Sequence, residues 1–319
     1  MAILAGIDEA GFGPLLGPLV VSSSVFSVEP ALLDADLWQA FRRSTGNSRK
    51  HLAGRLLIAD SKKAFNRARG LGHLERTSLA VLQSLGKEPG HLGGLLAALC
   101  PDCLPRLAEY PWYQDLESCP LAAQAADVRI ASKVFADDLT ANGAKLVQVQ
   151  SRCLDVAYYN GLVDTVRNKS QVLFVAVTQL IHAILTGFGD DRVRILVDRQ
   201  GGRAHYREHL LRSFPGVDLR ILREDEDNSI YEMRIGARVL RLSFEVGADD
   251  RHLPVALASM VSKYVRELLM ERINRYFVAM DGNLKPTAGY WKDGRRFVEE
   301  VRKQLPHLDI DPRRLIRSR

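Results

Sequence analysis

Residues 6–20 read GIDEAGFGPLLGPLV, and this stretch decides the fold. The apolar run at residues 3–7 stops at Asp8 and Glu9, a turn rich in Gly and Pro follows, and a second apolar run covers residues 18–26. Two apolar runs around such a turn predict a β-hairpin. Asp8 and Glu9 therefore lie at the end of the first strand, where a sheet holds side chains rigidly.

The rest of the chain mixes predicted strands with predicted helices. Strands are expected at residues 145–149, 193–197 and 217–222, and a hairpin around Gly236 and Ala237 at residues 233–246. A helix is expected after residue 60, with Asp60 or Ser61 as its N-cap. Further helices are expected at residues 171–185 and from Pro254 onward, where apolar residues follow i, i+3, i+4 spacing, with Asp249 in the turn before the second of them. The pattern predicts an α/β fold with a mixed sheet.

The composition of the chain divides it into three parts. Gly, Pro, Cys and aromatic residues collect at residues 86–143, which we interpret as an inserted lobe. Residues 1–85 and 144–280 then form the core, and residues 281–319 form a basic, helical C-terminal element.

The overall composition excludes several classes of protein. The 319 residues are 46% hydrophobic and 26% charged, which excludes wholesale disorder. No run approaches the roughly 18 consecutive apolar residues of a membrane span, and the N-terminus lacks the basic leader of a signal peptide. Four cysteines are too few for a secreted disulfide scaffold. We expect a cytoplasmic protein with no membrane contact, and the net charge of +6 is compatible with an anionic partner.

Acidic residues gather where predicted elements end or begin. Asp8 and Glu9 end one strand, Asp198 ends another, and Asp249 precedes the long helix. Neighbouring strands would bring these carboxylates together, and four such groups repel one another unless cations neutralise them. Mg²⁺ prefers oxygen ligands of this kind, and two ions can clamp the oxygens of a phosphoryl displacement. Taken singly, an acidic pair at a strand end is more often a solvated turn, and one ahead of a helix is more often a charge pair favoured by the helix dipole.

Other candidate residues have ordinary structural interpretations beside the functional ones. Lys62 and Lys63 open a helix, where the dipole disfavours cations, so we interpret them as phosphate contacts rather than solvated charges. Lys263 is a candidate contact, although Glu267 lies four residues on and can pair with it. The thiols of Cys100, Cys103 and Cys119 form half of a zinc-ribbon pattern, with buried thiols or redox activity as the alternatives.

Several motifs together resemble those of the ribonuclease HII family. Residues 6–20 resemble its N-terminal pattern G-x-D-E-A-G-R-G-P-x-x-G-P-V-V. Similar motifs follow in the family's order: Asp60-Ser61-Lys62-Lys63 for D-S-K-K, Asn168-Lys169-Ser170-Gln171 for N-x-x-Q, Leu196-Val197-Asp198 for its V-D-G strand end, Asp249 ahead of Ala258-Ser259-Met260-Val261-Ser262-Lys263 for A-S-I-x-A-K, and Gly289-Tyr290 for a C-terminal G-Y element.

The resemblance implies an RNase H-like fold, with a mixed five-stranded sheet flanked by helices, and a metal-dependent endoribonuclease. Asp8, Glu9, Asp198 and Asp249 would hold Mg²⁺ or Mn²⁺, two ions during catalysis, with Asp8 touching both. The partner would be an RNA/DNA hybrid or DNA containing ribonucleotides, cut on the 5′ side of a ribonucleotide to leave a 3′-hydroxyl and a 5′-phosphate. The resemblance further implies nucleic-acid contacts, namely Gly11, Phe12, Gly13, Ser61, Lys62, Lys63, Lys263 and Tyr290, with Lys62 on a phosphate and Tyr290 stacked on a sugar.

The chain also departs from the family pattern. Phe12 replaces the arginine of G-R-G, and Arg199 and Gln200 follow Asp198 where the family has glycine, so that they could crowd the metal site. The lobe and the hairpin near residues 230–246 lie outside the family's usual extent. Two alternatives follow: a catalytically weak hybrid-binding paralogue, or a nuclease of the same fold that acts on another nucleic acid.

Overall fold

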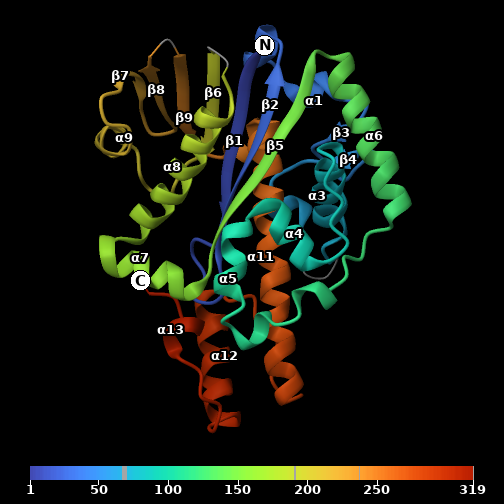
Figure 1. The fold of residues 1–319 in the computed structure, drawn as a ribbon, viewed down its shortest axis with the longest axis vertical. Helices are drawn as coiled ribbons and strands as arrows, with labels where there is room; N and C mark the ends of the chain where they lie inside the picture. Colours follow the sequence, from blue (N-terminus) through green and yellow to red (C-terminus); the bar gives the residue numbers. More distant parts are fainter. Residues whose placement is uncertain (67–69, 190–191, 237, 319) are drawn as a thin grey trace.

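The computed structural model describes residues 1–66, 70–189, 192–236 and 238–318 (Figure 1). Within these ranges one mixed sheet has the strand order β5-β2-β1-β6-β9-β8-β7. Its strands are β1 (Ala2–Ala10), β2 (Leu19–Val28), β5 (Ala144–Leu154), β6 (Arg192–Asp198), β7 (Asp218–Glu224), β8 (Asn228–Ile235) and β9 (Arg238–Glu245). A separate parallel pair joins β3 (Thr45–Gly46) to β4 (Leu56–Leu57).

The pairing of the strands confirms the predicted α/β class with a mixed sheet. β1 is antiparallel to β2 and parallel to β6, and β6 is parallel to β9. The predicted number of five strands is wrong, because the described sheet contains seven. The antiparallel partners β8 and β7 continue the sheet beyond β9. Sequence patterns located both of these strands, but they could not say that the two would extend the main sheet.

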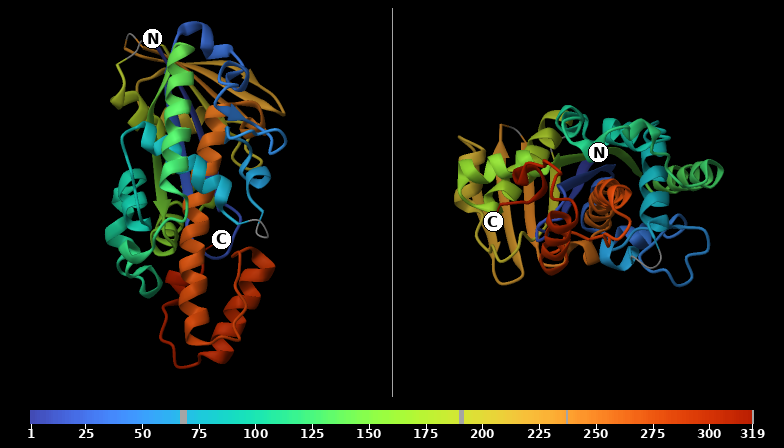
Figure 2. Two further views of the ribbon diagram at one scale, coloured as in Figure 1. Left: turned by 90° about the vertical axis from the view of Figure 1, so that its right-hand side faces the viewer. Right: turned by 90° about the horizontal axis from the view of Figure 1, so that it is seen from below.

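Helices cover both faces of the sheet. They are α1 (Leu37–Ala40), α2 (Ser61–Ala64), α3 (Gly72–Ser84), α4 (Leu92–Leu99), α5 (Leu104–Leu107), α6 (Ala125–Ala141), α7 (Val156–Val166), α8 (Lys169–Gly187), α9 (Arg207–Ser213), α10 (Ala248–Arg251), α11 (Leu253–Met280), α12 (Trp291–Gln304) and α13 (Pro312–Leu315). Side chains of α3, α4, α6 and α11 share one hydrophobic cluster, and those of α7, α8 and α9 share another. The two views of Figure 2 show the sheet between these layers.

Alternation along β1 divides its side chains between the two layers. Leu4 lies in the cluster with α11, whereas Ile3 and Ile7 lie in the cluster with α8. Gly6 allows the close approach of α11, because a Cβ atom there would lie 2.2 Å from the backbone of Pro254. The absence of a side chain at Gly6 therefore fixes the start of α11 against the middle of β1, close to the acidic end of the strand.

Helix α8 confirms the predicted buried helix at residues 171–185. In the described residues it is the one helix long and apolar enough to cross a membrane, with a mean hydropathy of 1.5 over its best window. Its residues Leu173, Leu180 and Ile181 are fully buried in the cluster that packs on β1 and β2. The apolar character of α8 is thus accounted for by its place in the core.

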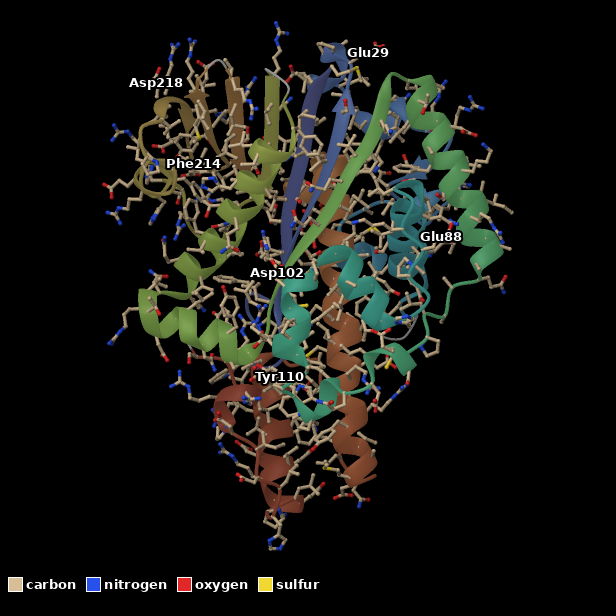
Figure 3. The ribbon with its side chains drawn as sticks, in the orientation of Figure 1. Glu29, Glu88, Asp102, Tyr110, Phe214 and Asp218 are labelled. Carbon is tan, nitrogen blue, oxygen red and sulfur yellow. The ribbon has the colours of Figure 1, made fainter. Side chains whose placement is uncertain are left out.

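The segment at residues 86–143 packs continuously with the sheet. Leu95 and Phe135 belong to the same cluster as Leu4 of β1. The Tyr110 hydroxyl donates to Asp155 at 2.6 Å, and Arg152 of β5 pairs with Asp102 at 2.6 Å. Figure 3 shows Asp102 and Tyr110 over the end of the sheet opposite to Glu29 and Asp218. The assignment of this segment as a separate lobe stays a prediction.

The four cysteines are free and buried, as the thiol interpretation expects. The Sγ atoms of Cys100 and Cys103 lie 3.6 Å apart. Cys153 of β5 is the third thiol beside them, and Cys119 instead directs its Sγ to the Asp115 carbonyl at 3.5 Å. The zinc pattern of Cys100, Cys103 and Cys119 is therefore not formed.

The C-terminal part extends the molecule beyond the sheet (Figure 2). The second half of α11 leaves the body and packs on α12, with the rings of Phe277 and Phe297 centred 5.3 Å apart. The chain then returns through α13, and Ile316 forms an antiparallel bridge with Leu16. This return brings the end of the chain back to the loop that follows β1.

Candidate active site

The acidic end of β1 forms the floor of the site. Asp8 is buried, with 5% of its surface exposed, and its Oδ1 accepts a hydrogen bond from the Glu9 amide at 2.7 Å. The carbonyl oxygen of Asp8 accepts from Ser262 of α11 at 3.0 Å. Because side chains alternate along a strand, Asp8 faces α11 and Glu9 faces the opposite layer. The end of this strand thus presents one carboxylate on each face of the sheet.

Strand β6 brings a third carboxylate to the same edge. The parallel register pairs Ile7 with Val197, so Asp8 and Asp198 are the next residues on adjacent strands. Asp198 Oδ1 accepts a hydrogen bond from the amide of Ala248, the first residue of α10, at 2.8 Å. Asp249 is the following residue, so this bond holds a fourth carboxylate beside the strand ends. The predicted turn at Asp249 is in fact the short helix α10.

The electrostatics confirm that these acids share one environment. Burial, followed by the charges of Glu9 and Asp198, raises the pKa of Asp8 well above its usual value. Burial and then Asp198 raise the pKa of Glu9 to about 8. Burial and then the charges of Asp198 and Asp60 raise the pKa of Asp249 to about 7. Each acid is therefore shielded from solvent first of all, and neighbouring carboxylates further disfavour its charged form.

Lys62 is the cation that faces this group. Burial lowers its pKa, but the charges of Asp60, Asp249 and Asp8 outweigh that effect and raise it. Asp60 caps α2 by accepting from the Lys62 amide at 2.9 Å, which confirms the predicted cap. One lysine beside five carboxylates leaves the site acidic.

The carboxylates do not form a finished metal site. Among residues 1–66, 70–189, 192–236 and 238–318, no three His, Cys, Asp or Glu side chains lie close enough together to hold an ion. The chemistry of the group nevertheless fits a hard divalent cation, since the donors are all carboxylate oxygens, and burial followed by the charges of neighbouring acids raises their pKa values. A bound ion would draw these side chains together.

The loop that follows β1 lies next to the acids and is held by two arginines. Gly11 has a φ of 94°, and a Cβ atom there would meet the side chain of Arg266 at 2.7 Å. Arg266 is fully buried, pairs with Glu267 at 2.9 Å, and lies 5.6 Å from the ring centre of Tyr290. Arg317, from the end of the chain, donates to the carbonyl oxygens of Gly11 and Phe12.

Tyr290 is joined to the same loop through the main chain. The Leu15 and Leu16 amides both donate to the carbonyl oxygen of Gly289, at 2.8 and 3.1 Å. The Tyr290 side chain remains 51% exposed. By contrast with Gly11, a Cβ atom at Gly13 would meet nothing within 4 Å. The structure therefore unites the glycine loop and Tyr290, with Gly13 open to an approaching molecule.

Three other predicted contacts have protein partners. Lys63 pairs with Asp250 at 2.5 Å. Lys263 pairs with Glu267 at 2.8 Å, as the structural alternative expects, so it is not presented as a free contact. Ser61 is buried and accepts from the Ser259 hydroxyl at 3.1 Å.

The residues after Asp198 have protein partners of their own. Arg199 donates to the carbonyl oxygens of Arg203 and Glu226. The Gln200 amide donates to the Tyr206 hydroxyl at 3.2 Å. That Arg199 and Gln200 could crowd a metal site stays a prediction.

Sequence reasoning missed three residues of the site. Asp60 was recognised only as a helix cap, although its place in a D-S-K-K motif could have indicated that its carboxylate belongs to the acidic group. Arg266 lies on the long helix one turn after the predicted contact Lys263, which pointed to the correct helix face. Arg317 gave no signal, since it is 306 residues away in sequence from the Gly11 carbonyl that it binds.

Comparison with known proteins gives similarities to solved structures. No family model matches the chain, and no curated protein matches it. RNase HII of Archaeoglobus fulgidus, solved as a PCNA complex, is 18% identical with a TM-score of 0.48, over 99% of this chain and 94% of that one. Bst-RNase HIII with Mn²⁺ is 13% identical with a TM-score of 0.40, over 99% and 66%. Ribonuclease H2 of Pyrococcus horikoshii is 15% identical with a TM-score of 0.39, over 97% and 90%.

All three proteins are named as ribonucleases H, and the sequence motifs of this chain resemble those of the ribonuclease HII family. Their identities are below 20% and their TM-scores below 0.5. The assignment of an activity therefore depends on the site itself: the acids at the ends of β1 and β6, the open glycine, and the exposed tyrosine.

Proposed function

We propose that this protein is a metal-dependent endoribonuclease that hydrolyses the RNA strand of RNA/DNA hybrids. Cleavage would occur on the 5′ side of a ribonucleotide and leave a 3′-hydroxyl and a 5′-phosphate. The single observation that carries the proposal is the group of four carboxylates, Asp8, Glu9, Asp198 and Asp249, whose pKa values are all raised and which lie beside an open glycine loop.

The acids would hold the divalent ions. Two Mg²⁺ or Mn²⁺ ions, when bound, would supply an activated water and neutralise the charge that develops on the phosphate. The resemblance to the ribonuclease HII family implies that Asp8 would contact both ions. The hydrogen bond that the Ala248 amide donates to Asp198 Oδ1 orients this carboxylate before any ion binds.

The neighbouring residues would bind and orient the nucleic acid. Lys62 retains its charge at neutral pH and can donate a hydrogen bond to a phosphate oxygen. Gly13 leaves room for the sugar of a ribonucleotide, whose 2′-hydroxyl distinguishes RNA from DNA. Tyr290 offers an exposed ring for stacking against that sugar. Together these groups explain how a chain with Phe12 in place of an arginine could still sense a ribonucleotide.

The experiment is cleavage of two labelled duplexes in Mg²⁺ and then in Mn²⁺. One duplex carries a single ribonucleotide in DNA, and the other carries a run of ribonucleotides opposite DNA. We expect cleavage of at least the second, and Asp8→Asn should lower kcat by about 10³-fold while hybrid binding changes little. Equal cleavage of an all-DNA duplex would point to a nuclease with another substrate.

A hybrid-binding paralogue with weak catalysis is the second candidate. The observation in its favour is that no three acids in the described residues are close enough to hold an ion. Tight hybrid binding without cleavage in either metal, and with no difference between the native chain and Asp8→Asn, would select this candidate.

We also propose that the protein works in the cytoplasm. Its four cysteines are all free thiols, which is typical of proteins from a reducing compartment. Cell fractionation that finds the protein outside the cytoplasm would reject this location.

A further inference from the structure

The end of the chain is fixed on the loop that follows β1. The Arg317 amide donates to the Leu15 carbonyl at 2.9 Å. Asn160 of α7, which is 1% exposed, donates to the Ile316 carbonyl at 2.9 Å and accepts from the Ser318 amide at 2.6 Å. Main-chain and side-chain bonds thus hold the tail in one position against the loop.

This docking buries the guanidinium of Arg317 beneath the loop. Arg317 is 4% exposed, and its guanidinium lies 4.1 Å from the ring centre of Tyr159. One terminal nitrogen donates to the Gly11 carbonyl and the other to the Phe12 carbonyl, the latter at 3.2 Å. Its Nε is buried without a partner. Among the ion pairs of the described residues none involves Arg317, so within residues 1–66, 70–189, 192–236 and 238–318 no carboxylate pairs with its guanidinium.

The two carbonyl bonds determine where the next two amides point. In a trans peptide the N–H of one residue points away from the C=O of the residue before it. Because the Gly11 and Phe12 carbonyls face Arg317, the Phe12 and Gly13 amides face the opposite way. Within the described chain neither amide donates to another group. Successive amides on one side form a donor pair suited to an anionic or hydroxyl oxygen.

We propose that Arg317 is a positioning residue that aligns the Phe12 and Gly13 amides toward the sugar–phosphate backbone of a ribonucleotide. The inference rests on the proposed function, and adds to it a residue that acts through the loop and not by touching the substrate. The unbalanced charge of Arg317 also favours an anionic molecule on the other side of the loop. Arg317 thus supplies a guanidinium from the C-terminal tail, beside a loop that has Phe12 in this chain and not an arginine.

The test compares Arg317 with Arg313, a second arginine of the same tail that pairs with Asp164 away from the loop. Binding is measured in the Asp8→Asn background, for a duplex with one ribonucleotide and for the same duplex in all-DNA form. We expect about tenfold tighter binding of the first duplex, since one or two hydrogen bonds amount to roughly that factor. Adding Arg317→Ala should reduce the ratio to about two, and Arg313→Ala should leave it unchanged.

Kinetics on the active protein provide the readout that a purely structural role would not move. Arg317→Ala should raise KM for the ribonucleotide duplex by about tenfold and leave kcat within about threefold, since the acids are untouched. Arg317→Lys keeps the charge and the main-chain bonds of the tail, but it lacks the fork that reaches two carbonyls. It should restore the ratio in part, so a folding defect of Arg317→Ala does not decide the result.

Two negative results are distinguishable. If the native chain cleaves and discriminates, and both Arg317 variants discriminate as Arg313→Ala does, Arg317 only anchors the tail and this inference is overturned. If the native chain neither cleaves hybrids nor prefers the ribonucleotide duplex, the proposed function fails first, and the role of Arg317 fails with it.

Discussion

Two neighbouring regions of the fold carry opposite charge. At the ends of β1 and β6, Asp8 and Asp198 lie with other acids, and burial is the first cause that raises the pKa of each. Beneath the loop that follows β1, Arg266 and Arg317 are buried, and of these two only Arg266 has a carboxylate partner among the described residues. A divalent cation would neutralise the first region, and a phosphodiester would neutralise the second. Under the proposed function, metal and nucleic acid would together balance the charges of this site.

The largest effect on kcat should come from substituting an acid of the first region, and an adjacent acid outside that region provides the control. Asp249 and Asp250 are adjacent, but only Asp249 lies in the acidic group, while Asp250 pairs with Lys63 at its edge. We expect Asp249→Asn to lower kcat by about 10³-fold, because under the proposed function it removes a metal ligand. Asp250→Asn should change kcat by less than about threefold, since exposed ion pairs contribute little. Steady-state kinetics in Mg²⁺ measure both, and equal losses would show that the acidic group is not the catalytic one.

The second region can be tested with its own pair of residues. Gly11→Ala forces a Cβ atom to within 2.6 Å of the Pro18 carbonyl at a φ of 94°, so it should destabilise the fold by about 1–3 kcal/mol. Gly13→Ala meets nothing in the protein, so thermal unfolding should remain unchanged. If substrate approaches this backbone, Gly13→Ala should still lower kcat/KM by about tenfold through a clash with the sugar. Full activity of Gly13→Ala would mean that the loop does not contact substrate.

The same contrast explains what the sequence could predict. Asp8, Asp198 and the group around Asp249 follow local patterns, namely a strand that stops at an acid or a helix that starts after one. Such patterns identify the residue and the end of the element, so the acidic region was predictable. Lys263 also followed a local rule, since its partner Glu267 lies one helical turn away.

The basic region depends on contacts between distant parts of the chain. Arg317 meets Gly11 only because α11 to α13 turn the chain back on itself, and no spacing in the sequence encodes that return. The extension of the main sheet by β7 and β8 was missed for the same reason, because these strands carried visible strand patterns without any signal of their partners. Sequence thus predicted the chemistry of the acids and left the arrangement of the loop to tertiary structure.

The smallest expected effect is on stability, whose dependence on pH reports the protonation of the acids. Glu9 and Asp249 have pKa values of about 8 and about 7 in the folded chain, above the usual values of 4.5 and 3.8. Between these limits the folded state holds protons that the unfolded state has lost, so stability falls as pH rises. Without metal, Tm should decrease by a few degrees from about pH 5.5 to about pH 8.

Mg²⁺ and a variant separate this effect from general titration of the chain. An ion that binds only the folded state raises Tm, and it should do so more at about pH 8, where the acids are free of protons. Glu9→Gln should flatten the metal-free decrease, because it removes the group with the highest of the two pKa values. Differential scanning fluorimetry across pH, with and without Mg²⁺, measures both trends. A Tm that rises with pH in the metal-free protein would mean that positive charge already balances the acids, and the acidic region would then need no ion.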